Sequence, residues 1–113
     1  MKYDLKERTT KFAQKIINLC KKAPKDVVTN PIINQLVKSG TSIGANYCEA
    51  NGGSSKRDFK NKIFICKKES KETKYWLKIL ARAAPQLKEE CEELSKEAQE
   101  YILIFSKIAI STN

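Results

Sequence analysis

The segment 41–52 has the sequence pattern of a helix with few charged or bulky side chains. From position 27 to position 48 the only charged residue is Lys38, although 31% of the chain as a whole is charged. Small residues occur on every face of the segment, and small side chains let helix backbones approach closely. A helix that lacks a polar face is normally buried on most sides. The sequence therefore predicts a central helix that is enclosed by neighbours from its own chain and from another protomer.

The length and composition of the chain favour one helical domain that spans residues 1–113. A chain of 113 residues is long enough for one domain that buries about 65% of its unfolded surface. Four glycines and three prolines provide few turns for a sandwich or a barrel. No signal-peptide pattern opens the sequence, and no apolar run approaches the ~20 residues of a membrane span. We therefore expect a soluble cytoplasmic protein with no membrane contact.

The four cysteines show no spacing that is typical of a metal site. Cys20, Cys48, Cys66 and Cys91 each fall on a different predicted helix, and no two of them form a CxxC pair. Free cysteine is among the most buried residue types in proteins. We expect buried free thiols at all four positions, with disulfides or a bound metal as the alternatives.

The residue types that most enzymes need are missing or scattered. The chain contains no histidine, so it lacks the commonest general base and the commonest transition-metal ligand. The segment around residues 52–55 has neither the Walker spacing nor the preceding strand of a phosphate-binding loop. We therefore expect a protein that is not an enzyme, with no catalytic residue, no metal and no cofactor.

Apolar residues recur every three or four positions along four segments, which is typical of amphipathic helices. Asp4 with Glu7 resembles an N-terminal capping pair, Asn30-Pro31 is a second helix start, and Ser55 is a third. Pro24, Gly52-Gly53 and Pro85 separate the segments. The predicted helices span approximately residues 4–23, 31–51, 55–83 and 86–110.

Four helices of similar length with short connections predict antiparallel neighbours. The expected fold is all-α: a left-handed, up-down-up-down antiparallel four-helix bundle. Residues 101–110, YILIFSKIAI, are apolar on more than one face, so excess apolar surface would remain on a single chain. The third helix carries Ser70 and Thr73 in its apolar seam, which suggests close packing against the small residues of the second helix. We expect a homo-oligomer.

Positive charge is concentrated on the first and third predicted helices. Residues 1–25 carry eight basic and two acidic groups, and residues 55–83 carry ten basic and three acidic groups, in a chain of net charge +9. On the third helix one flank of the apolar seam is dominated by lysine, a surface that can follow phosphates without reading bases. A solvated helix face that keeps the protein soluble is the alternative. The candidate phosphate contacts are Arg57, Lys60, Lys67, Lys71, Lys74 and Lys78, with Arg8, Lys11 and Lys15 as secondary contacts.

The other flank of the third helix mixes carboxylates with a tryptophan. Glu69 and Glu72 are three residues apart, and with Glu49 they could form a metal or acid–base cluster. We favour instead their pairing with nearby lysine, serine or asparagine groups, because a charge at a helix contact needs a partner. Trp76 would anchor this layer with its indole N–H available to a carboxylate, and Asn46 is a natural partner.

Residues 39–77 resemble the four-helix-bundle proteins of the 23S rRNA intervening-sequence family. The resemblance covers the second and third helices closely and the rest of the chain more loosely. The matching elements are Ser39-Gly40, Ser42-Ile43-Gly44-Ala45-Asn46, Glu49-Ala50, Asp58-Phe59, Lys68-Glu69, Glu72-Thr73 and Tyr75-Trp76-Leu77.

The resemblance implies a homopentameric ring of four-helix protomers. A relative of that kind, the accessory protein of diversity-generating retroelements, binds nucleic acid and a reverse transcriptase through its basic surface. The resemblance therefore implies RNA or DNA, or a protein such as a reverse transcriptase, as partners. The motif residues are helix-contact residues rather than catalytic ones. Our hypothesis is a non-enzymatic nucleic-acid-binding or accessory protein, and the alternative is a structural scaffold for a protein partner.

Overall fold

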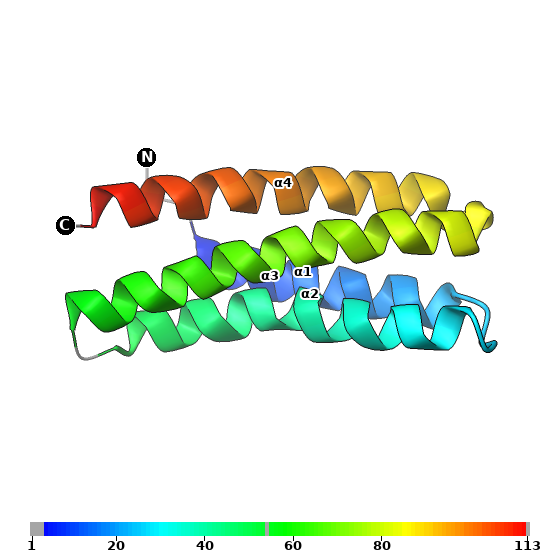
Figure 1. Cartoon of the computed structure of the whole chain (residues 1–113), viewed down its shortest axis with the longest axis horizontal. Helices are drawn as coiled ribbons and strands as arrows, with labels where there is room; N and C mark the ends of the chain where they lie inside the picture. The colour runs from blue at the N-terminus through cyan, green and yellow to red at the C-terminus, as the bar shows by residue number, and fades with distance from the viewer. Residues whose placement is uncertain (1–3, 54, 113) are drawn as a thin grey trace.

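The computed structural model describes residues 4–53 and 55–112, and in this part of the chain it contains helices and turns but no strand. Figure 1 shows the long helices side by side along one axis, with the chain reversing its direction at each connection. The all-α prediction is therefore confirmed. The elements are α1 (Leu5–Lys22), α2 (Thr29–Asn51), α3 (Lys56–Ala83), the short 3-10 helix η1 (Pro85–Leu87) and α4 (Lys88–Ser111).

Side-chain caps fix the starts of α1 and α3 as the sequence predicts. The backbone N–H of Glu7 donates to Asp4 Oδ1 at 3.2 Å, and the N–H of Asp58 donates to Ser55 Oγ at 3.1 Å. Each bond satisfies one of the four N–H groups that a helix start leaves without an intrahelical partner. These two caps set where the basic helices begin.

The start of α2 differs from the prediction by two residues. The helix begins at Thr29 rather than after Asn30, because Asp26 supplies the cap. Asp26 Oδ1 accepts the N–H of Thr29 at 2.8 Å and the N–H of Val28 at 3.0 Å. The Thr29 hydrogen bonds also hold the pKa of the Asp26 carboxyl below its usual value. A carboxylate outside the helix therefore moves its first turn toward the N-terminus.

The core contains the predicted apolar seams. Phe12 of α1 and Tyr101 of α4 are fully buried, and their rings meet edge to face with 5.3 Å between centroids. Edge-to-face packing of this kind adds to the stabilisation that comes from burial alone. Predicted seam residues of α1 and α3 that are buried are Leu5, Thr9, Phe12, Ile16, Leu19, Ala23, Ile63, Cys66, Ser70, Thr73, Leu77 and Leu80.

The small residues of α2 let α1 approach closely. A Cβ atom on Gly40 would lie 2.9 Å from Cγ1 and Cγ2 of Ile16, and one on Gly44 would lie 3.0 Å from Oγ1 of Thr9. The sequence prediction placed the small residues of this helix against the third helix, and for the two glycines that prediction is wrong. Their place on the α1 side follows from the helical phase of α2, which the sequence pattern left open.

One face of α2 lies open in the single chain. Asn34, Lys38, Ala45, Cys48 and Glu49 are exposed, so the prediction of a helix enclosed on most sides is not met by its own chain. The expectation of four buried thiols is also wrong at one position. Cys48 is exposed because it shares this outer face, whereas the other three thiols are buried.

Apolar surface remains exposed on α4, as the pattern of residues 101–110 predicts. Leu103 is 55% exposed and Ile110 is 75% exposed. They lie outside the arc of α4 that packs on the other helices, which holds Tyr101, Phe105 and Ala109. Among the described residues, no helix combines the length and the apolar character that crossing a membrane requires.

Candidate nucleic-acid interface

Four basic residues of α1 are paired with carboxylates within the same chain. Arg8 Nη2 lies 2.6 Å from Glu100 Oε1, and Lys15 Nζ lies 3.5 Å from Glu97 Oε1. Lys22 is similarly paired with Glu90 of α4, and Lys11 with Glu7 one turn before it in α1. Of the predicted secondary contacts, Arg8, Lys11 and Lys15 therefore each have an acidic neighbour.

Three glutamates of α4 form a row that faces α1. Glu90, Glu97 and Glu100 are separated by seven and three positions, which places them on one side of a helix. The hydroxyl group of Tyr101 lies beside this row, at 2.5 Å from Glu97 Oε2 and 3.2 Å from the carbonyl oxygen of Arg8. Burial, and then the Glu97 carboxylate, raises the pKa of Tyr101 above its ordinary value. The α1–α4 contact is thus a structural polar layer.

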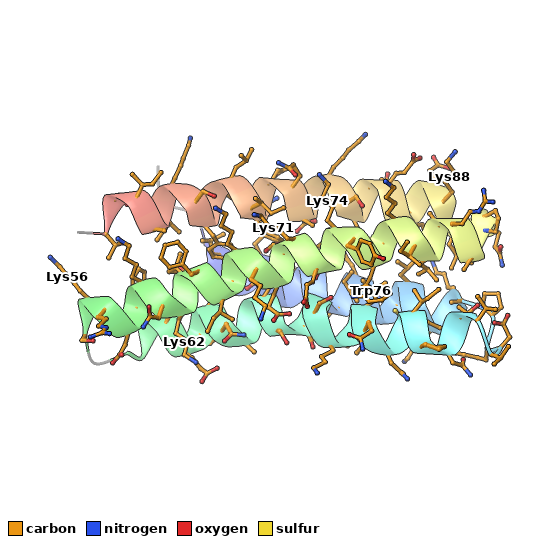
Figure 2. All side chains as sticks on the ribbon, in the orientation of Figure 1. Lys56, Lys62, Lys71, Lys74, Trp76 and Lys88 are labelled. Carbon is orange, nitrogen blue, oxygen red and sulfur yellow. The ribbon has the colours of Figure 1, made fainter. Side chains whose placement is uncertain are left out.

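Three lysines of α3 have no such acidic neighbour. In the part of the chain that the structure describes, no ion pair joins Lys67, Lys71 or Lys78 to a carboxylate. Lys74 Nζ donates to the neutral side chain of Gln99 of α4, at 2.7 Å. Figure 2 shows Lys71 and Lys74 on the side of α3 that faces α4. From Lys67 to Lys78 the predicted lysine flank is therefore a basic surface without ion pairs among the described residues.

We call this surface the α3 basic face. It comprises Arg57, Lys60, Lys67, Lys71, Lys74 and Lys78, which recur every three, four or seven positions. Arg57 is exposed and Lys60 is half-buried at the N-terminal end of the face, while Lys71, Lys74 and Lys78 are exposed along its C-terminal half. The structure places all six predicted contacts on one helix.

A groove of about 610 Å³ continues this face between α3 and α4. Leu77, Ala81, Pro85 and Cys91 provide apolar lining, and Glu92 is its only acidic member. Burial raises the pKa of the Cys91 thiol to about 11, so at neutral pH it is not a thiolate nucleophile. The basic residues that line the groove are Lys74, Lys78, Arg82 and Lys88.

Sequence reasoning missed Arg82 and Lys88. Arg82 lies four positions after Lys78 and continues the same helix face, so its spacing could have revealed it. Lys88 begins the next helix, and only the turn at η1 brings it to the groove. No pattern within α3 contains that information.

The other flank of α3, which carries carboxylates and Trp76, faces α2. Figure 2 shows Lys62 and Trp76 on this side, and Lys62 Nζ lies 3.5 Å from Glu49 Oε1. Burial, and then the neighbouring charge of Glu72, raises the pKa of Glu69. Among the described residues there is no group of three Asp, Glu, Cys or His side chains that could hold a metal ion.

The residues of the predicted motif differ in burial. Ser39, Gly40 and Gly44 are buried, and Glu49 is exposed but reaches Lys62 of α3. Glu72 is exposed. The amide of Asn46 donates to the Ser42 carbonyl of its own helix at 2.8 Å. Asn46 therefore caps a local backbone group, whereas the prediction made it a partner of the carboxylates on α3.

Comparison with known proteins identifies the family. The sequence profile described as 23S rRNA-intervening sequence protein matches residues 1–107. A crystal structure of a protein with unknown function from the S23 ribosomal protein family of Bacteroides thetaiotaomicron is similar, with a TM-score of 0.81 and 35% identity. The match covers 92% of this chain and 96% of that one. No curated protein gives a significant match. The chain belongs to the 23S rRNA-intervening sequence protein family.

Proposed function

We propose that this protein is a non-enzymatic nucleic-acid-binding factor that holds the phosphate backbone of RNA or DNA on the α3 basic face. The observation that carries the proposal is the asymmetry of charge between the two basic helices. Carboxylates of α4 pair with Arg8, Lys15 and Lys22 of α1. On α3, Lys74 meets the neutral side chain of Gln99, and Lys67, Lys71 and Lys78 have no ion pair among the described residues. Net positive potential therefore concentrates on α3.

The chemistry of the face suits backbone binding rather than base reading. Lysine is a compact point charge on a flexible stem, which follows phosphates without the fixed fork geometry of arginine. Contacts to phosphate fix position and carry no sequence information directly. Arg8, Lys11 and Lys15 contribute less, because a phosphate must compete with their carboxylate partners.

We further propose that protomers assemble through the outer face of α2. That face carries few charges and holds small or neutral side chains, among them Ala45 and Cys48. The family resemblance favours a homopentamer of left-handed, up-down-up-down bundles. A ring of this kind would present several α3 basic faces at once, which strengthens binding to one long polyanion by raising the effective concentration.

A pair of triple variants with equal charge change tests the proposed function. Lys67→Gln/Lys71→Gln/Lys78→Gln removes three uncompensated charges, and Lys11→Gln/Lys15→Gln/Lys22→Gln removes three paired ones. Affinity falls as salt rises. We expect the first variant to make the slope of log affinity against log salt less steep, by about 2 to 3 for each bound protomer. The second variant should change the slope by less than about 1.

Fluorescence anisotropy with labelled RNA and DNA oligonucleotides from low to moderate salt measures both slopes. Exposed lysines tolerate substitution, so thermal unfolding should confirm that both variants stay folded. Equal effects of the two triple variants would contradict the assignment to α3. Absence of binding at low salt would overturn the proposed function.

A scaffold for a protein partner, such as a reverse transcriptase, is the second candidate function. The exposed apolar residues Leu103 and Ile110 favour it, because apolar side chains gathered at a surface are typical of protein contacts. Co-purification of a defined partner that survives nuclease treatment, and that Leu103→Lys abolishes, would support this candidate. Loss of the partner on nuclease treatment would favour nucleic-acid binding.

A further inference from the structure

The α3 basic face contains the same arrangement of lysines and an aromatic residue twice. Phe64 follows Lys60 by four positions and precedes Lys67 by three, and Tyr75 stands in the same relation to Lys71 and Lys78. Side chains three or four positions apart are neighbours on a helix surface. Each aromatic ring therefore lies between two lysines.

The two arrangements share one face of the helix. They are offset by eleven residues, which is about three full turns and a rise of about 16 Å. One unbroken α-helix, α3, carries both, so their separation and relative orientation are fixed. A flexible polyanion that lay along the helix would meet them one after the other.

Both rings are open to solvent rather than packed in the core. Phe64 is 49% exposed and Tyr75 is 55% exposed. The Tyr75 ring meets the half-buried Trp76 edge to face, with 5.0 Å between centroids, and this contact restrains its orientation. Both ring faces therefore have area available to a ligand that approaches α3.

We propose that Phe64 and Tyr75 stack on unpaired bases, so that the α3 basic face selects single-stranded nucleic acid over duplex. The inference rests on the proposed function and adds to it the class of nucleic acid. In a duplex the bases stack on one another and their faces are not available, whereas a single strand offers them freely. Proteins that bind single strands without sequence preference combine a positive track with aromatic stacking platforms.

The flanking charges favour this occupant over an apolar one. Of the four lysines that flank the rings, Lys67, Lys71 and Lys78 have no ion pair among the described residues. An apolar partner would leave these charges uncompensated or desolvated. A single strand supplies a base for each ring and phosphates for the lysines beside it.

Three ligands of equal length test the inference: an unstructured single-stranded RNA, its DNA counterpart and a blunt DNA duplex. The variants are Phe64→Ala, Tyr75→Ala and Tyr75→Phe, the last of which keeps a ring for stacking. Val28→Ala is the matched control, because Val28 is 61% exposed and lies at the start of α2, outside the two basic helices. Circular dichroism confirms that each variant is folded.

We expect the natural chain to bind both single strands more tightly than the duplex at the same salt concentration. Phe64→Ala and Tyr75→Ala should each weaken single-strand binding by about fivefold or more and leave duplex binding within about twofold. Tyr75→Phe and Val28→Ala should bind like the natural chain. The two single strands separate an RNA preference from a DNA preference.

Equal affinity for duplex and single strand, or alanine variants that weaken both alike, would overturn the inference and leave the proposed function in place. Absence of binding to all three ligands at low salt would overturn both. Light scattering at one protein concentration gives a separate outcome. If the alanine variants lower the molecular mass of the assembly, the rings lie at a contact between copies and the stacking role is wrong.

Discussion

The close approach of α1 and α2 at Gly40 gives a sharp test of the fold. Replacing Gly40 by alanine would place a Cβ atom 2.9 Å from Cγ1 and Cγ2 of Ile16 and 3.3 Å from its Cβ. These atoms lie next to the Ile16 backbone, and Ile16 is fully buried. The side chain therefore cannot swing aside, and α1 has to shift.

Two opposing effects set the change in the free energy of unfolding that Gly40→Ala causes. Alanine in place of glycine within a helix favours folding by about 1 kcal/mol, and overpacking of a tight core costs about 1–3 kcal/mol, occasionally more. Contact with three atoms close to the Ile16 backbone puts the cost at the upper end. We expect a net loss of about 2 kcal/mol, which is a large part of a typical domain stability of about 5–15 kcal/mol.

The assay is equilibrium unfolding in urea at one fixed protein concentration, supported by thermal melting. A loss of this size should lower the melting temperature by about 10 °C in a domain of this length. Gly52→Ala is the control, because the nearest atoms to a Cβ at Gly52 are backbone oxygens at 3.8 Å. It should change the free energy of unfolding by less than about 0.5 kcal/mol. A Gly40→Ala chain as stable as the natural one would refute the close-packing explanation.

The thiols provide two further predictions. Cys48 should react with a thiol reagent in the folded protein, and the reaction should slow as protein concentration rises, because assembly through α2 would cover Cys48. Cys20, Cys66 and Cys91 are buried and should react only after unfolding. Mass spectrometry of the labelled chain measures these rates. Fast labelling of Cys48 at every concentration would argue against assembly through α2. Burial raises the pKa of Cys66 to about 12 and that of Cys20 and Cys91 to about 11. The unfolded chain therefore releases these protons first. The contribution of the thiols to stability should be constant between neutral pH and about pH 8.5. It should fall as pH rises toward 11 and 12, by up to about 1.4 kcal/mol per pH unit for each thiol. Urea unfolding at pH 8 and pH 10.5 checks the fall, and equal midpoints would contradict it.

Local patterns were sufficient for the helices and for most of their buried faces. The seam of α1, from Leu5 to Leu19, and the Ser55 cap of α3 are as predicted, because caps and periodicity depend on residues within about one turn. The outer face of α2 was harder to predict. Small uncharged residues suit a helix contact on any side, so the pattern alone did not assign Gly40 to α1 or leave Cys48 exposed.

The basic face shows the same division. The sequence shows the lysine spacing along α3, and it also shows the repeat that places Phe64 and Tyr75 between lysines. The sequence alone gave α1 and α3 similar positive charge. It could not show that half of the basic residues of α1 pair with carboxylates of α4.

What the sequence determined by itself is the set of four amphipathic helices, their starts and the lysine-rich flank of α3. What only the tertiary structure decided is which charges remain free. Arg8 meets Glu100 across 92 positions of sequence and Lys22 meets Glu90 across 68, and Lys88 reaches the groove only after the turn at η1. Helix formation depends on residues that are neighbours along the chain. Charge compensation depends on the distance between charged groups in space, and only the packing of the helices determines that distance.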